Sequence, residues 1–164
     1  MKKHFITLPL VIFFIKAASF GYHRSIPGDE VPYPEGYRLW THVKTGLVGP
    51  SNPNFQFSGG YHHIYANQKA MQGYDSGYFP EGSVIVFDVL DTKEQNGNTQ
   101  EAARNHLDVM VKDSLKYATT GGWGYEEFKG DSHTERLINT PALKLQCANC
   151  HARKEDRVFS EFRK

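Results

Sequence analysis

The chain has two cysteines, and both lie in one short segment near the C-terminus. Cys147 and Cys150 are separated by two residues and His151 follows directly, which gives the pattern C-x-x-C-H. This pattern is the attachment signature of a c-type haem. On one turn of helix, two thiols can form thioether bonds to the vinyl groups of the porphyrin while the adjacent imidazole binds the iron. We therefore expect one covalently bound haem c with His151 as an iron ligand, its second ring nitrogen donating to a carbonyl or carboxylate.

Two other uses of this cysteine pair are weighed against haem attachment. A dithiol oxidoreductase carries C-x-x-C at the start of a helix after a strand, near the start of its domain. Here the motif lies near the C-terminus, and no βαβ pattern precedes it. A zinc site would need a fourth ligand from among scattered histidines, because no second paired cluster exists. The pattern therefore favours covalent haem.

The N-terminus has the pattern of a signal peptide. Lys2 and Lys3 precede an apolar run over residues 5–15, and small residues follow it. We expect residues 1–19 to be the signal peptide, cleaved after Ser19 or alternatively after Gly21. A retained membrane anchor is the other interpretation, but the run is too short to span a bilayer comfortably. No cysteine follows the run, which excludes a lipoprotein anchor, so we expect a periplasmic protein with no membrane anchor after cleavage.

Length and composition indicate a single domain built from strands and turns. The chain has 164 residues with 19 Lys and Arg against 18 Asp and Glu, and a net charge of +1 gives no field that would attract nucleic acid. Aromatic residues make up 13% of the chain, with 15 Gly and 8 Pro spread along it. This mixture favours strands over a helical bundle. Residues 20–33 read as an extended lead-in.

The elements that must position the motif are predicted from hydrophobic periodicity. We expect a short amphipathic helix over residues 34–46, begun by Pro34 and ended by Gly46. Strands are expected over residues 61–66 and 82–91, the second in the centre of a sheet. Between these two strands, the pattern predicts a helical turn or two capped by Asn67.

The second half of the chain continues the sheet. Residues 92–103 contain Asn96-Gly97 and read as a loop or hairpin connection. Residues 106–113 alternate, with Leu107 and Val109 on one face and Met110 on the other. A fourth strand is expected over residues 123–130, entered through two glycines. The prediction is an α+β fold, mainly antiparallel β-sheet with a few short helices, and a haem-bearing helix near the C-terminus.

Four segments, taken in chain order, resemble the cytochrome P-460 family, which includes the beta-sheet cytochromes c′-beta. They are PEGYRLW, YFPEGSVIVFDV, DVMVKDSLKYATTGGWGYEEF and CANCHARKEDRVFS. The resemblance covers most of the chain after residue 34, so we assign residues 34–164 to a cytochrome P-460-like haem domain. It implies a periplasmic monohaem protein, often a homodimer, whose iron is held by His151 and is open to a small ligand on its other face.

The family divides by a link between a lysine and the porphyrin edge. The resemblance implies that members with this link oxidise hydroxylamine, and that the c′-beta members lack it and bind nitric oxide or similar gases. Lys69 is the candidate for the link, with a solvated lysine on a short helix as the alternative. Lys112 is a rival, whose other role would be an ion pair with Asp113 or a neighbour, or packing of its stem along the sheet.

Further residues could belong to the haem pocket, and each also has an ordinary structural role. His62 and His63 stand on opposite faces of a strand, so at most one can point into the pocket. A general base for nitrogen chemistry could be Glu126 or Glu127, although strand carboxylates are commonly solvated. Possible sixth ligands, or core residues, are Met71 and Met110. Possible porphyrin contacts, or packing residues, are Trp123, Tyr125 and Phe128.

The sixth iron position determines the expected function. An open position suits a nitric oxide-binding or hydroxylamine-oxidising protein, and the second of these would be a haem oxidoreductase. The alternative is a six-coordinate electron-transfer cytochrome c, with methionine or histidine as the second ligand. We also expect a redox partner of unknown identity, which hydroxylamine oxidation and electron transfer would both require.

Overall fold

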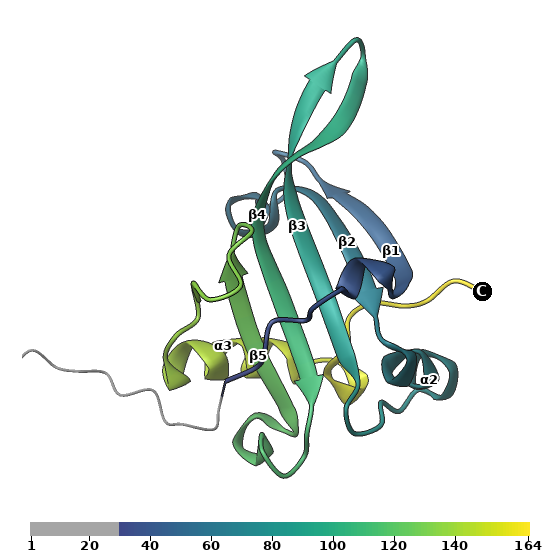
Figure 1. The fold of residues 1–164 in the computed structure, drawn as a ribbon, viewed down its shortest axis with the longest axis vertical. Helices are drawn as coiled ribbons and strands as arrows, with labels where there is room; N and C mark the ends of the chain where they lie inside the picture. The colour runs from purple at the N-terminus through teal and green to yellow at the C-terminus, as the bar shows by residue number, and fades with distance from the viewer. Residues whose placement is uncertain (1–29) are drawn as a thin grey trace, which may run out of the picture.

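A computed structural model describes residues 30–164 as one five-stranded antiparallel sheet flanked by short helices (Figure 1). The strands follow one another in the order β1-β2-β3-β4-β5, so each pairs with its neighbour in sequence. This architecture confirms the predicted α+β class. The expected signal peptide and most of the lead-in lie outside the described residues.

The elements have the following bounds. The strands are β1 Thr41–Val48, β2 Gly60–Ala66, β3 Val84–Gln95, β4 Asn98–Lys112 and β5 Trp123–Lys129. The helices are α1 Phe55–Ser58, α2 Gln68–Ser76 and α3 Pro141–His151, with 3₁₀ turns η1 Tyr37–Leu39, η2 Ala118–Thr120 and η3 Glu155–Arg157. No helix among these is long and apolar enough to cross a membrane.

The prediction of a helix over residues 34–46 is wrong. Only the turn η1 forms there, and β1 begins two residues after it. The β-branched residues Thr41, Val43 and Thr45 suit a strand, and pairing with β2 satisfies the backbone of the segment. Gly46 therefore does not cap a helix. It lies in β1 against the imidazole of His62, where a Cβ would come within 2.4 Å of the ring.

The connection between β3 and β4 is a long hairpin. The sequence predicted either a loop or a hairpin over residues 92–103, and the second alternative is the one that forms. Its turn is Asn96-Gly97, with left-handed φ values of 53° and 75° that this residue pair accommodates. The two strands stay paired up to the turn, and their ends project beyond the rest of the sheet (Figure 1). The expected cap of α2 is also present, because the Asn67 side chain accepts a hydrogen bond from the Ala70 amide.

The sheet has two covered faces. The back face, which is turned toward the viewer in Figure 1, buries Leu107 and Val109 against the N-terminal segment around Tyr37. The front face, on the far side in that view, buries Met110 beneath α2, α3 and the C-terminal segment. The predicted alternation in β4 is therefore confirmed. Because strand side chains alternate, each residue of the central strands belongs to one of these two layers.

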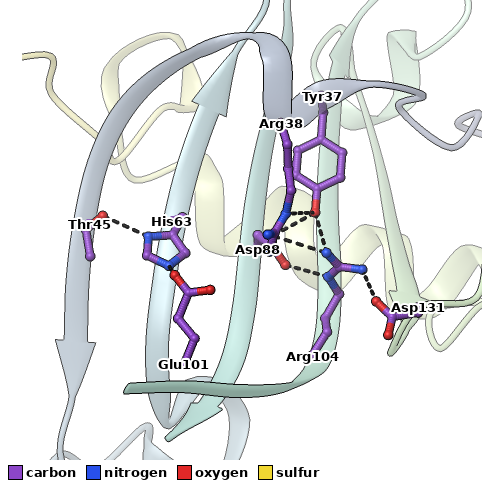
Figure 2. Close-up of polar contacts among 8 residues, drawn as sticks. All are labelled: Tyr37, Arg38, Thr45, His63, Asp88, Glu101, Arg104 and Asp131. Atoms are coloured by element: carbon purple, nitrogen blue, oxygen red, sulfur yellow. Dashed lines mark hydrogen bonds and ion pairs between the residues drawn. The ribbon is translucent and has the colours of Figure 1, made fainter. Parts of the chain in front are cut away.

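A buried carboxylate ties the N-terminal segment to the back face (Figure 2). Asp88 of β3 is fully buried and accepts hydrogen bonds from the Tyr37 hydroxyl at 2.6 Å, Arg104 Nε at 2.6 Å and Arg38 Nη2 at 2.9 Å. Arg104 also pairs with Asp131. Burial raises the pKa of Asp88, but the bonds from Arg104, Tyr37 and Arg38 outweigh burial and leave the pKa below its ordinary value.

Replacing this carboxylate by an amide tests its contribution. Asp88→Asn removes the buried counter-charge of Arg104 and leaves it only the exposed Asp131, so we expect the free energy of unfolding at neutral pH to fall by roughly 3 kcal/mol, at the lower end for a broken buried pair. Because the pKa of Asp88 is lowered by folding, its charge stabilises the wild type above about pH 4 and that contribution is lost as pH falls further. Urea unfolding of the haem-loaded protein from pH 7 down to pH 3 measures both effects.

Glu135→Gln is the matched control, because Glu135 forms an exposed pair with Lys129. It should change the stability by less than about 1 kcal/mol. Equal losses in the two variants, or an unchanged acid dependence in Asp88→Asn, would contradict the role given to Asp88.

Candidate functional site

The C-x-x-C-H segment forms the last turns of α3. Thr140 caps this helix by accepting a hydrogen bond from the Leu143 amide, and Pro141 occupies its first turn, where a missing N–H costs nothing. The spacing i, i+3, i+4 places Cys147, Cys150 and His151 on one side of the helix. The motif is therefore presented by a helix whose start is well defined.

A cavity of about 300 Å³ opens between the front face of the sheet and α3. Cys147 and His151 line it from the helix, and residues 158–160 line it from the C-terminal segment. The sheet and the loop before α3 contribute Ile64, Ile85, Phe87, Asp108, Val109, Met110, Tyr125, Glu126, Glu127 and Ile138. Most of these side chains are apolar, as in sites that hold a large flat organic ligand.

His151 is held in a single tautomer. Its Nδ1 lies 2.7 Å from the backbone carbonyl of Arg157, and a carbonyl only accepts hydrogen bonds, so Nδ1 carries the proton. The expected bond from the second ring nitrogen to a carbonyl is therefore present. Burial lowers the pKa of His151, which favours the neutral imidazole that binds metals. The lone pair of Nε2 is left for an iron.

The two cysteines differ in environment. Cys147 is half-buried on the cavity wall, whereas Cys150 is exposed and is not among the lining residues. Burial raises the pKa of the Cys147 thiol to about 11. A dithiol oxidoreductase needs the opposite shift, because its attacking sulfur must be a thiolate. Within residues 30–164 the side chains with metal-ligand spacing are His106, Asp108 and Glu127, which include neither cysteine of the zinc alternative.

The residues present fit a c-type haem. The cavity offers apolar walls, a cysteine and an imidazole with one free nitrogen, all from or beside α3. The Tyr125 hydroxyl is buried at the cavity wall beside the Arg157 guanidinium, which can only donate to its oxygen, and its proton has no acceptor among the described residues. Burial raises its pKa to about 12, so it stays protonated and can donate to an occupant.

The family model for cytochrome P460 matches residues 34–160, which is most of the chain. The chain belongs to the cytochrome P460 family. It is accordingly a c-type haem protein with one covalently bound haem c that takes a small-molecule ligand at the haem. A comparison with curated proteins found no match.

The structure of this cytochrome P460 family member separates the candidate lysines from the cavity. Lys69 lies on α2, is exposed, and donates to the Glu81 carbonyl at 3.0 Å; it is not a lining residue. Lys112 is buried and also lies outside the lining. It pairs with Asp156 at 2.7 Å, so the ion-pair role is confirmed, with Asp156 as its partner and not Asp113, one of the alternatives.

The two neighbouring histidines do face opposite ways. His63 lies on the back face between Thr45, at 2.8 Å, and Glu101, at 2.6 Å (Figure 2). His62 lies on the front face and stacks on Phe87 with ring centroids 4.7 Å apart. Phe87 lines the cavity, so His62 stands behind the wall rather than in it. Met110 lines the cavity, and Met71 packs in the front core.

The aromatic candidates divide in the same manner. Tyr125 lines the cavity and its ring centroid lies 5.1 Å from that of His151. Trp123 is buried in the front core outside the lining, and Phe128 is buried on the back face.

Among the candidate bases, Glu126 borders the cavity but is buried in ion pairs with Arg136 at 2.9 Å and Lys144 at 3.1 Å.

Sequence reasoning missed Phe87 and Asp108, which the sheet register brings to the cavity beside the predicted Glu127. Phe87 pairs with Asp108, and Asp108 pairs with Glu127, so these side chains form one row across three strands. His106 lies next to this row, with Nε2 3.7 Å from Asp108. Their alternation on strands was visible in the sequence, but the register that joins them was not.

Single cysteine variants test the attachment. Cys147→Ser and Cys150→Ser should each yield protein with one thioether in place of two, because each thiol forms one bond to the porphyrin. The pyridine complex of the reduced protein should then absorb at a longer wavelength than that of the wild type. A wild type whose haem is extracted by acidic organic solvent would contradict covalent attachment.

Proposed function

We propose that the protein binds nitric oxide, or a similar small ligand, at a haem iron whose sixth position is open. The observation that supports this most is the composition of the cavity wall opposite α3. Ile64, Ile85 and Phe87 line it from β2 and β3, and the described lining contains no histidine besides His151. Apolar side chains leave an iron without a second protein ligand, which is the condition for binding a diatomic gas.

Met110 is the remaining candidate for a sixth ligand, and its neighbours argue against that role. In the sheet register, Met110 pairs with Tyr125, and the Tyr125 ring packs on the imidazole of His151. A second protein ligand to a haem iron would have to come from a part of the wall that does not support His151. Met110 belongs to the part of the wall that supports His151, and its burial in the front core accounts for it.

The absence of a lysine from the described cavity lining favours the gas-binding members of the family, which lack a lysine link to the porphyrin. No lysine is present among the described lining residues, and Lys69 makes its hydrogen bond away from the cavity, to the Glu81 carbonyl. This placement supports a haem without a lysine link, as the resemblance implies for the c′-beta members. The N-terminal pattern of basic, apolar and small residues supports export to the periplasm, where cytochromes of this kind would meet their gas and redox partners.

An absorption spectrum with and without nitric oxide tests the proposal. The ferric protein should be high-spin, the ferrous protein should take up nitric oxide, and Met110→Leu should leave both spectra unchanged because the methionine does not touch the iron. A low-spin ferric spectrum with a methionine-to-iron band that disappears in Met110→Leu would instead establish the six-coordinate electron carrier.

Hydroxylamine oxidation is a second candidate, favoured by the carboxylates on the cavity wall. Oxidation of hydroxylamine would release electrons, which the haem would pass to a redox partner, and protons, which a base at the wall must accept. Glu127 is suited to this task because burial, and then the charge of Asp108, raise its pKa toward neutrality. His106 donates from Nδ1 to the Asn105 side chain at 3.0 Å, which directs Nε2 toward Asp108. The three groups could carry a proton from the cavity to the protein surface.

Glu127→Gln distinguishes the two candidates. If the protein oxidises hydroxylamine, kcat in this variant should fall about 100-fold or more, since the amide cannot accept the proton, while nitric oxide uptake stays unchanged. Glu135→Gln, on the exposed Lys129 pair, is the control. A wild type that binds nitric oxide but does not turn over hydroxylamine would leave gas binding as the function.

A further inference from the structure

The bond from His151 Nδ1 to the Arg157 carbonyl controls how strongly the imidazole can donate to an iron. A stronger hydrogen bond at Nδ1 gives the ring more imidazolate character and makes Nε2 more basic. At 2.7 Å this bond is short for a neutral N–H donor. The position of the Arg157 carbonyl therefore affects how strongly His151 can donate to the iron.

The turn that carries this carbonyl has an unfavourable backbone conformation. Asp156 and Arg157 have φ values of 37° and 64°, so two consecutive residues with side chains occupy the left-handed region. Such a conformation persists only where surrounding contacts hold it. Arg157 supplies one of them, because its Nη1 donates to the Ala148 carbonyl of α3 at 2.9 Å.

Asp156 supplies the contacts that reach the rest of the protein. One carboxylate oxygen accepts from Lys112 Nζ at 2.7 Å and lies 3.4 Å from Trp123 Nε1. The other oxygen accepts from the Phe79 amide at 2.7 Å. These donors come from β4, β5 and the loop after α2, so one side chain joins the turn to three separate parts of the fold.

Lys112 is the strongest of these anchors. Its side chain is 7% exposed, its backbone bonds to Ser83 and Gly82 on the neighbouring strand segment, and its ammonium lies 5.1 Å from the Trp123 ring centroid. A buried ammonium needs a nearby counter-charge, and the Asp156 carboxylate provides it. Neither partner can move away without leaving the other charge buried and unpaired.

We propose that Lys112 and Asp156 are positioning residues for the iron ligand. The pair fixes the turn, the turn fixes the Arg157 carbonyl, and the carbonyl sets the electron donation of His151 to the iron. Lys112, the lysine of the MVKD segment, thus affects the haem site although it does not line the cavity. The inference rests on haem attachment at His151. The iron–histidine stretching band also needs the open sixth position of the proposed function, whereas the midpoint potential reports on the imidazole in either coordination state.

Lys112→Met tests the pair, because methionine keeps most of the apolar stem and removes the charge. In the ferrous haem protein without nitric oxide, the iron–histidine stretching band should shift to lower frequency and the midpoint potential should rise, since a weaker Nδ1 bond makes the imidazole a poorer donor. Lys112→Arg, which keeps a charged donor, should restore both values at least in part. Resonance Raman spectroscopy and a redox titration make these measurements.

Lys129→Met is the matched control, because it removes an exposed ion pair of the same 2.7 Å length on the adjacent strand. It should change neither value. If Lys112→Met does not accumulate with haem, Asp156→Asn decides by the same two readouts, since the amide keeps the shape and one acceptor oxygen. Haem-loaded variants of Lys112 and Asp156 with the stretching frequency and potential of the wild type would overturn the proposal, whether or not the protein binds nitric oxide.

Discussion

One hydrogen bond, from His151 Nδ1 to the carbonyl of Arg157, connects the fold to the chemistry of the site. It leaves a single nitrogen for the iron and orients the ring on the cavity wall. A helix of eleven residues at the edge of a sheet could not hold an imidazole ring in place by itself. The sheet does so through the buried charge pair between Lys112 and Asp156.

The two faces of the sheet serve different purposes. The back face is closed by the N-terminal segment, which Asp88 holds through Tyr37 and two arginines. That network is fully formed in the structure and leaves the back face sealed. The front face retains a cavity of about 300 Å³, lined by the sheet, α3 and the C-terminal segment. A sheet with one face sealed and one face open can bind a large flat group without losing its core.

The sequence predicted the parts of the molecule that depend on nearby residues. C-x-x-C-H, the cap at Asn67 and the turn at Asn96-Gly97 are local patterns, and each corresponds to the expected local structure. The predicted helix over residues 34–46 was wrong. The spacing of Tyr37, Trp40 and Val43 fits a helix, but the half-exposed edge strand β1 forms there because pairing with β2 stabilises it. Tertiary pairing overrode the local pattern.

The site itself could be predicted only in part, for the same reason. The row formed by Phe87, Asp108 and Glu127 exists because three strands align in one register, and no single segment contains that information. Lys112 finds its partner 44 residues away, in a turn whose left-handed backbone no composition rule would suggest. Long-range contacts of this kind convert a recognisable motif into a specific iron site.

Peptide mapping of the mature, exported protein by mass spectrometry tests the central claim most directly. The account predicts one haem, found on the peptide that contains both Cys147 and Cys150, and no haem on any peptide containing Lys69. A protein without haem, with the two thiols free or joined to each other, would contradict it.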